Sequence, residues 1–517
     1  MTAERRYDLL VIGGGINGAG IARDAAGRGL SVLLVEQHDL AAHTSSSSTK
    51  LIHGGLRYLE YREFGLVRKA LKERETLLRA APHLIGPLRF VMPHSPNLRP
   101  AWLIRAGLFL YDHLARRELL PGSRGILMRD HPAGAPLVES IERGFVYSDA
   151  RVDDARLVVL NALDAREHGA TIATRVKLVK AERDEHEWHC ELQQRNGSRL
   201  AVRARALVNA TGPWVGQLLH DAVGRNARHH VRLVKGSHIV TRRLFEHDHA
   251  YIFQNPDNRI IFAIPYEDEF TLIGTTDVEY LGDPARVAIA EDEERYLCES
   301  VNRYFKRKIS PADICWRYSG VRPLLEEEGA DNPSAVTRDY RLELDLGAQR
   351  SGAPLLSVFG GKITTFRKLA EEAVDQLCGT LHYPVRAWTA GVPLPGGDIA
   401  HAQFEPFAMR FASEHTWLPA ELARRYARAY GTLAERIVGT ASSLSELGPE
   451  IAPGLFEREL AHLRDNEWAQ CADDVLWRRS KIGLHLSAGE LDSARADIDA
   501  WFARSPLQAT AASTLAP

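Results

Sequence analysis

A glycine-rich turn near the N-terminus, set between two strands and a helix, constrains the fold of this chain more than any other feature. Tyr7–Ile12 has the apolar pattern of a buried parallel strand, and Gly13–Gly18 follows it with a GxGxxG spacing. Ala19–Arg28 has helical spacing, and Ser31–Val35 predicts a second strand that ends at Glu36. A βαβ unit of roughly thirty residues with these features is typical of dinucleotide-binding folds.

The residues of this turn have physical roles in holding a pyrophosphate. Gly13 permits the tight turn, Gly15 lets the backbone approach the pyrophosphate, and Gly18 packs the helix against the strand. The helix N-terminus, where Asn17 lies, presents free amide groups to the anion. Glu36 is placed to accept hydrogen bonds from ribose hydroxyls, which favours an adenosine without a 2′-phosphate. The segment therefore predicts binding of FAD or NAD.

The composition excludes several classes of function. The chain has 517 residues, enough for two or three domains, and its net charge of −2 argues against a nucleic-acid partner. Its five cysteines include no CxxC pair, so we predict no metal site and no disulfide scaffold, which fits a reducing cytoplasm. We expect no signal peptide, because the first strand begins at residue 7. No apolar stretch reaches the roughly 18 residues needed to span a bilayer.

Two later segments are predicted to return to the cofactor. Ala206–Gly212 and Leu355–Thr365 each have the pattern of a strand, a glycine turn and a following helix. Antiparallel strands are predicted between them over roughly 233–280, with a hairpin of Arg259–Tyr266 and Phe270–Thr276. A contiguous unit would suffice for NAD, whereas three distant segments suit the long FAD molecule and leave the flavin end to a separate cap domain.

The other segments are predicted to be helices and connections. Helical periodicity covers 64–81, and the proline-rich stretch 82–100 is interpreted as a crossing between domains. The C-terminal residues 405–505 have the pattern of an almost entirely helical domain. Its predicted helices include Pro419–Ala429 and Glu457–Leu484.

Seven motifs follow one another over nearly the whole chain. They are residues 10–36, Ser46–Tyr58, Leu207–Trp214, Lys235–Val240, Gly274–Tyr280, Tyr318–Pro323 and Ser357–Arg367. Together they resemble the bacterial aerobic FAD-dependent glycerol-3-phosphate dehydrogenase family. The helical tail with Ala472–Arg479 is similar to the C-terminal domain of that family.

The resemblance implies an α/β fold with a glutathione-reductase-type, Rossmann-like FAD-binding domain. An antiparallel-sheet substrate domain and an all-α C-terminal domain are expected beside it. The expected ranges are 1–80, 146–235 and 340–385 for the FAD-binding domain, 81–145 and 236–339 for the substrate-binding domain, and 390–517 for the helical domain.

The resemblance also implies oxidation of sn-glycerol 3-phosphate to dihydroxyacetone phosphate by hydride transfer from C2 to FAD. We expect the FAD to be held noncovalently and the electrons to pass to ubiquinone. The protein would be cytoplasmic and bound peripherally to the cytoplasmic face of the inner membrane. The oligomeric state stays open, with a homodimer as one candidate.

A phosphate with nearly two negative charges needs cations of matched geometry, and the planar fork of arginine serves best. We expect Arg322, in the motif Ser-Gly-Val-Arg-Pro, to be the main phosphate ligand. Arg57 and Tyr58, which follow a Gly-Gly turn, are expected to reach the substrate as well.

Removal of the C2 hydroxyl proton calls for a general base, and histidine suits this at neutral pH. His53 and His238 are the candidates, and both stay open, with His53 ranked slightly first. His238 is also placed among the substrate ligands. Lys362 follows Gly360 and Gly361 at the start of a helix, where it would stabilise the anion of the reduced flavin or contact the substrate.

Further residues are predicted to hold the cofactor. The serine-rich loop before the site strand offers hydroxyl and amide groups to the pyrophosphate or the ribityl chain. With the residues of the two later glycine turns, the predicted contacts are Ser48, Thr49, Gly55, Ala210, Thr211, Gly212, Gly361, Lys362 and Thr364.

Trp102–Leu114 is apolar and aromatic and is flanked by arginines. It fits a helix that lies in a membrane interface, with arginines at anionic lipid. The alternative is a buried helix of the substrate domain, which we favour slightly from the sequence.

Three other functions stay open as alternatives. The first is a glycerol-3-phosphate oxidase that gives its electrons to oxygen. The second is an FAD oxidase of the same fold that acts on a 2-hydroxy or amino acid, although the pair Arg57 and Arg322 favours a phosphate. The third is a non-catalytic flavoprotein that binds a partner through its helical tail.

Overall fold

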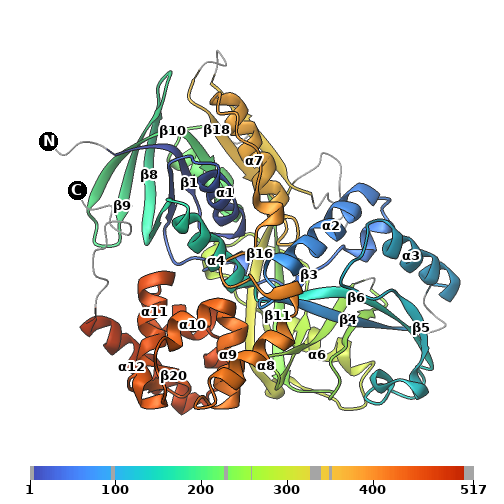
Figure 1. Cartoon of the computed structure of the whole chain (residues 1–517). Helices are drawn as coiled ribbons and strands as arrows, with labels where there is room; N and C mark the ends of the chain where they lie inside the picture. Colours follow the sequence, from blue (N-terminus) through green and yellow to red (C-terminus); the bar gives the residue numbers. More distant parts are fainter. Residues whose placement is uncertain are drawn as a thin grey trace.

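Two β-sheets, one of eight and one of ten strands, form the core and are flanked by helices (Figure 1). The structure, a computed structural model, describes residues 5–94, 99–225, 231–257, 259–325, 339–347 and 352–505. The N-terminal βαβ unit belongs to the eight-stranded sheet. The C-terminal helices lie below this sheet in the view of Figure 1.

Five parallel strands, in the order β18-β10-β1-β2-β7, form the centre of the eight-stranded sheet. Leu9 and Val11 of β1 pack against the helices α1, α4 and α7, whereas Leu10 and Ile12 pack against the arm of β8 and β9. Both faces of β1 are therefore buried, as its apolar sequence predicts. The bounds are β1 (Arg5–Ile12), α1 (Ile16–Gly27), β2 (Val32–Glu36), α4 (Asp154–Glu167), β7 (Thr171–Thr174), β8 (Val176–Arg183), β9 (Trp188–Gln194), β10 (Arg199–Asn209), α5 (Val215–Asp221), β17 (Arg341–Asp345), β18 (Leu355–Phe359) and α7 (Phe366–Thr380).

The ten-stranded sheet has the order β15-β11-β14-β13-β12-β4-β6-β3, with β16 paired to β11 and β5 paired to β6. The register of β11 and β16 places His238 opposite Tyr318 and Val234 opposite Arg322. The predicted hairpin is confirmed as β13 and β14. The bounds are β3 (Leu51–Ile52), α2 (Phe64–Ala80), β4 (Ile85–His94), α3 (Ala101–His113), β5 (Arg124–Leu127), β6 (Arg143–Val152), β11 (Val231–Arg242), β12 (Ala250–Gln254), β13 (Ile260–Tyr266), β14 (Phe270–Gly274), β15 (Val278–Glu279), α6 (Glu291–Asn302) and β16 (Ile314–Leu325).

Sheet membership departs from the expected domain ranges at three strands. β3, β6 and the first residues of β11 lie in the ten-stranded sheet, although the ranges assigned 1–80 and 146–235 to the FAD-binding domain. The stretch 82–100 was expected to be a crossing, but it contains the ten-residue strand β4. β4 carries Pro87 and Pro93, and its second edge pairs with β12 only at Phe90 and Val91. Proline is tolerated there because the described strands leave the rest of that edge unpaired.

The C-terminal domain is helical, and the predicted helix Pro419–Ala429 is confirmed as α9. The prediction of one helix over Glu457–Leu484 is wrong. α11 ends at Glu467, because Trp468 takes a left-handed backbone conformation, and a separate π-helical turn covers Asp474–Arg479. The bounds are α8 (Phe404–Glu414), α9 (Ala420–Tyr430), α10 (Ala434–Val438), β19 (Glu450–Ala452), β20 (Leu455–Phe456), α11 (Glu457–Glu467) and α12 (Ala488–Arg504).

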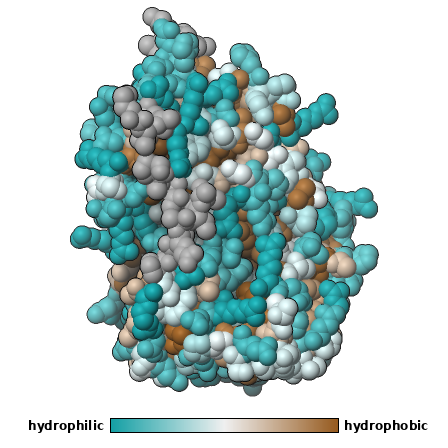
Figure 2. All heavy atoms as spheres, turned by 60° about the vertical axis from the view of Figure 1, so that its left-hand side comes forward, coloured by the Kyte–Doolittle hydropathy of each residue, from teal (hydrophilic) through white to brown (hydrophobic). Residues whose placement is uncertain are grey.

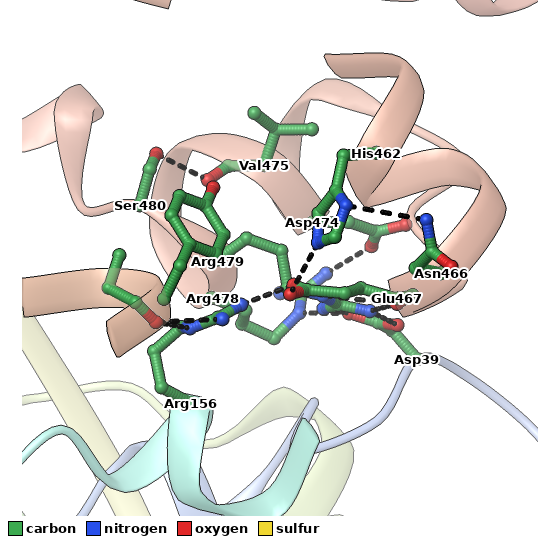
Figure 3. Close-up of polar contacts among 12 residues, drawn as sticks. Asp39, Arg156, His462, Asn466, Glu467, Asp474, Val475, Arg478, Arg479 and Ser480 are labelled. Carbon is green, nitrogen blue, oxygen red and sulfur yellow. Dashed lines mark hydrogen bonds and ion pairs between the residues drawn. The ribbon is translucent and has the colours of Figure 1, made fainter. Parts of the chain in front are cut away.

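Buried ion pairs join this helical domain to the parallel sheet (Figure 3). Asp39, three residues after β2, accepts hydrogen bonds from Arg479 at 2.5 and 2.8 Å and from Nε of Arg478 at 2.6 Å. Arg156 on α4 pairs with Glu467 at the end of α11. Breaking a buried pair typically costs about 3–5 kcal/mol. These pairs therefore fix the helical domain against the loop that follows β2.

α3 forms where a helix was predicted, but the expectation that it is buried is wrong. Of its residues, all described, only Leu108 and Tyr111 are buried. Trp102 is 72% exposed and Phe109 57% exposed. The helix packs on the ten-stranded sheet through one side, so its remaining apolar side chains lie at the surface.

Candidate active site

A cavity of about 1110 Å³ lies between the two sheets. It begins at the carboxyl ends of β1, β2, β10 and β18, where ligands of open α/β sheets bind. Residues from the serine loop, β11, β16 and the turn before α7 line its other walls. The cavity therefore brings together segments that are more than 300 residues apart in the sequence.

The glycine turn after β1 forms a cradle that side chains would fill. A Cβ atom on Gly13 would lie 2.6 Å from the carbonyl oxygen of Ala210, and one on Gly18 would lie 1.9 Å from that of Gly13. Gly15 lines the cavity, and a Cβ there would meet only Ser45 Oγ, at 3.1 Å, among described atoms. Gly13 and Gly18 thus allow the strand and the helix to pack closely, whereas the backbone at Gly15 is open to a ligand. This arrangement fits a pyrophosphate.

Glu36 lies at the end of β2 and lines the same cavity. Its carboxylate accepts hydrogen bonds from the amides of Gly14 and His38, each at 2.7 Å. Burial raises the pKa of Glu36, although both amide hydrogen bonds act against this shift. The position agrees with the predicted contact to a ribose.

The turn before α7 meets the N-terminus of α1. Asn17 Nδ2 donates to the carbonyl oxygen of Gly360 at 3.2 Å, and Asn17 Oδ1 is buried with no hydrogen-bond partner among the described residues. Gly360 and Gly361 have φ angles of 72° and 99°. Asn17, Gly361, Lys362 and Thr364 line the cavity beside this orphaned acceptor. A donor group of a bound FAD would fit there.

Most of the predicted site residues come together in this cavity. Those that line it are Gly13, Gly15, Asn17, Glu36, Ser48, Thr49, His53, Tyr58, Ala210, Thr211, Gly212, His238, Arg322, Gly361, Lys362 and Thr364. Gly18, Gly55 and Arg57 are not among the lining residues. Gly18 packs α1 on β1, and Gly55 has a φ of 74° with the Tyr58 ring against it. Contact of Arg57 with the substrate stays a prediction.

His53 lies between β3 and the turn that carries Tyr58. Its amide donates to Oγ1 of Thr364 at 3.2 Å, which ties the His53 loop to the turn before α7. The ammonium of Lys362 lies 3.9 Å from the ring centroid of Tyr58. His53, Tyr58 and Lys362 therefore form one side of the cavity.

His238 also lines the cavity, from β11, and is only 2% exposed. Its Nε2 shares a 3.0 Å hydrogen bond with Oγ1 of Thr49, and its ring stacks on Tyr318 at a centroid distance of 4.8 Å. Burial, the ammonium of Lys50 and the guanidinium of Arg322 hold the pKa of His238 well below its usual value. His238 is therefore neutral at physiological pH.

Ser48, which was predicted to bind the cofactor, forms hydrogen bonds with a buried aspartate. Its amide and hydroxyl donate to Asp154 at 3.2 and 2.7 Å. Lys50 also pairs with Asp154, at 2.8 Å. Asp154, at the start of α4, thus holds the serine loop in place.

Arg322 enters the cavity from β16 beside Gly236 and Thr275. Its guanidinium pairs with Asp277 and donates to the carbonyl oxygen of Thr276 at 3.1 Å. Asp277 was not among the predicted site residues. It belongs to the motif Gly274–Tyr280, which was the available signal, but its partner lies 45 residues away in the sequence.

A parallel sheet with a dinucleotide cradle, joined to an antiparallel sheet across one large cavity, is consistent with the class of FAD-dependent oxidoreductases. Residues 8–367 match the family described as FAD dependent oxidoreductase, and residues 387–499 match the C-terminal domain of alpha-glycerophosphate oxidase. The chain belongs to this family of FAD-dependent oxidoreductases, and its cofactor is FAD.

The names of three similar proteins indicate which reactions occur within this class. The chain is 56% identical to a glycerol-3-phosphate dehydrogenase of Pseudomonas aeruginosa, over 94% of this chain and 93% of that protein. It is 50% identical to the D-erythritol 1-phosphate dehydrogenase of Brucella abortus, over 97% of this chain and 99% of that protein. The structure of a glycerol-3-phosphate dehydrogenase from Bacillus halodurans complexed with FAD aligns with a TM-score of 0.78 and 27% identity, covering 97% of this chain and 91% of that chain.

Proposed function

We propose that this enzyme oxidises sn-glycerol 3-phosphate to dihydroxyacetone phosphate. The observation that carries the proposal is that Arg322, Lys362, His53 and His238 line the same cavity as the residues of the FAD cradle. Two cations suit a phosphate monoester, and two imidazoles suit removal of a hydroxyl proton. The names of the relatives support the same reaction.

Each residue has a distinct part in this reaction. Arg322 binds the phosphate through its planar fork, with Lys362 as a second positive charge. His53 or His238 accepts the proton of the C2 hydroxyl while the C2 hydrogen leaves as hydride. Bound FAD supplies the acceptor for this hydride. The buried position of His238 keeps it neutral and thus able to accept a proton.

A second candidate substrate is a longer polyol phosphate. The relative named D-erythritol 1-phosphate dehydrogenase shares half of its residues with this chain. Turnover with a quinone analogue should be compared for sn-glycerol 3-phosphate, D-erythritol 1-phosphate and glycerol. The proposal expects the highest kcat/KM for sn-glycerol 3-phosphate. A higher value for the erythritol ester would transfer the function to that substrate.

We further propose that the electrons pass to ubiquinone at the cytoplasmic face of the inner membrane. Within the described residues, no helix is long and apolar enough to cross a membrane. Support for surface binding comes from α3, whose outer side exposes Trp102, Leu103, Phe109 and Leu110 near the exposed Arg116. By contrast, the face with the β8–β9 arm and the C-terminal helices is largely hydrophilic in Figure 2. Apolar side chains beside arginines suit a headgroup boundary.

Flotation with vesicles tests this attachment. Trp102→Glu with Phe109→Glu should release the enzyme from vesicles that contain anionic lipid. The matched control is Met409→Glu, because Met409 is 70% exposed but lies on α8 of the helical domain. Equal flotation of both variants would contradict the role of α3. Reoxidation of the reduced enzyme by air faster than by a quinone analogue would favour the oxidase alternative.

A further inference from the structure

Glu293, on the first turn of α6, contacts Ser237 and Thr276, whose sequence neighbours line the cavity. The residue is buried, and its carboxylate accepts hydrogen bonds from the hydroxyls of Ser237 at 2.9 Å and Thr276 at 2.7 Å. Its second oxygen pairs with the ammonium of Lys235 at 2.6 Å and accepts from the amide of Ala290 at 2.9 Å. Burial would raise the pKa of Glu293, but these hydrogen bonds outweigh it and lower the pKa.

Two of the sequence motifs meet at this carboxylate, and a third joins them through Ser237. Lys235 and Ser237 belong to the motif with His238, and Thr276 belongs to the motif with Asp277. Ser319, from the motif with Arg322, shares a 2.8 Å hydrogen bond with Ser237. The reaction itself accounts for His238 and Arg322, but it gives no role to these other polar residues.

The contacts continue from Glu293 to Arg322. The hydroxyl of Thr276 also accepts a hydrogen bond from the amide of Ser237 at 2.9 Å, so the turn after β14 is held to β11. That turn supplies both partners of Arg322, the carbonyl oxygen of Thr276 and the carboxylate of Asp277. A shift of the turn would therefore move the guanidinium.

We propose that Glu293 is a positioning residue, which sets the phosphate-binding geometry of Arg322 through the turn Thr275–Asp277. It acts through other groups, because it does not line the cavity. Its charge offsets the buried ammonium of Lys235, and its two hydroxyl partners fix the turn against β11. The inference rests on the proposed function, since it assigns Arg322 to the substrate phosphate.

The test measures binding of inorganic phosphate to the oxidised holoenzyme through the flavin absorbance, without turnover. Flavin reduction by sn-glycerol 3-phosphate is then measured anaerobically on the same proteins. Glu293→Gln should weaken phosphate binding about tenfold and raise the KM for sn-glycerol 3-phosphate similarly, because a neutral amide accepts the hydrogen bond from Thr276 more weakly and leaves the ammonium of Lys235 without its ion pair. The limiting reduction rate and the FAD content should change less than about twofold.

Three further variants separate positioning from general destabilisation. Thr276→Val should weaken phosphate binding as Glu293→Gln does, whereas Thr276→Ser retains the hydroxyl and should restore it. Glu294→Gln is the control, because Glu294 is the next residue on α6 and pairs with Arg317 at 2.8 Å, away from the cavity.

Unchanged phosphate affinity in Glu293→Gln, or equal losses in Glu293→Gln and Glu294→Gln, would overturn the inference. Absence of phosphate binding in the unmodified enzyme would overturn it too. If the unmodified enzyme binds phosphate but sn-glycerol 3-phosphate does not reduce its flavin, the proposed function fails while the role of Glu293 stands.

Discussion

The guanidinium of Arg322 forms an ion pair with Asp277 at the wall of the cavity. Both side chains are partly exposed there, so a ligand can approach the pair. The pair orients the arginine before a substrate arrives, which reduces the ordering that phosphate binding requires. An arginine held in this way can still offer further donors to a phosphate, because the guanidinium has five.

Replacing Arg322 by alanine should weaken the use of sn-glycerol 3-phosphate far more than the retention of FAD. Losing a charge-assisted phosphate contact should cost about 2–4 kcal/mol, or roughly 30- to 1000-fold in kcat/KM. Steady-state kinetics and the flavin content measure both effects. Arg317→Ala is the control, because Arg317 lies on the same strand but pairs with Glu294. An unaltered KM for sn-glycerol 3-phosphate in Arg322→Ala would contradict the role of Arg322 as a phosphate ligand.

Gly15→Val should abolish FAD retention. Gly15 lines the cavity and offers open backbone, so a branched side chain would fill the space for the pyrophosphate. The purified variant should be colourless and folded, as judged by circular dichroism and the flavin-to-protein absorbance ratio. Full FAD occupancy in this variant would contradict the role of Gly15 in the FAD cradle.

His53→Asn should slow flavin reduction about 10²–10⁴-fold while the substrate still binds, because asparagine cannot accept the proton. The reduction rate of the unmodified enzyme should rise with pH through a histidine pKa of about 6–7.5. That limb should vanish in His53→Asn. Burial holds the pKa of His238 well below its usual value, so we assign this limb to His53. Rapid mixing without oxygen measures these rates.

Other outcomes would reassign the base. A normal rate in His53→Asn and a slow rate in His238→Asn would give the role to His238, with no limb near neutral pH. If neither variant is slowed, Lys362 becomes the next candidate.

We expect the free energy of unfolding to fall in acid because of His83. It lies between α2 and β4, fully buried near Gly396 and Gly431, with no hydrogen-bond partner for either ring nitrogen among the described residues. Burial and the guanidinium groups of Arg156 and Arg428 lower its pKa to about 3. Because the unfolded chain takes up this proton near pH 6.5, the stability present above that pH is lost as the pH falls toward 3, by up to about 1.4 kcal/mol per unit.

The urea midpoint of the holoenzyme at pH 7.5 and 5.5 measures this loss. His83→Leu should reduce the difference between the two midpoints. His186→Leu, at an exposed position, should leave the difference as in the unmodified enzyme. The same acid loss in all three proteins would contradict the assignment to His83.

The N-terminal unit was predictable because its signals are local. The GxGxxG spacing, two apolar strands and Glu36 fall within one short segment, and the structure places each as expected. The break after Glu467 was not predictable from helical spacing. It depends on the left-handed backbone of Trp468 and on the attraction of Arg478 and Arg479 to Asp39, which lies more than 400 residues away.

The site shows the same division between local and distant signals. His53, Arg322 and Lys362 stand within two residues of a glycine in distinctive motifs, so their residue types could be matched to the chemistry. Asp277 and Glu293 act through tertiary contacts, and no spacing in the sequence indicates which acid faces which base. The exposure of α3 likewise depends on which of its sides meets the ten-stranded sheet.

The most direct test of this account is an anaerobic titration of the purified holoenzyme with sn-glycerol 3-phosphate. The flavin absorbance at about 450 nm should fall as the substrate is added, with dihydroxyacetone phosphate formed in proportion to the flavin reduced. Glycerol at the same concentrations should leave the band unchanged. If sn-glycerol 3-phosphate leaves the flavin oxidised while a 2-hydroxy acid or an amino acid bleaches it, the assignment of the site to a phosphorylated polyol is contradicted.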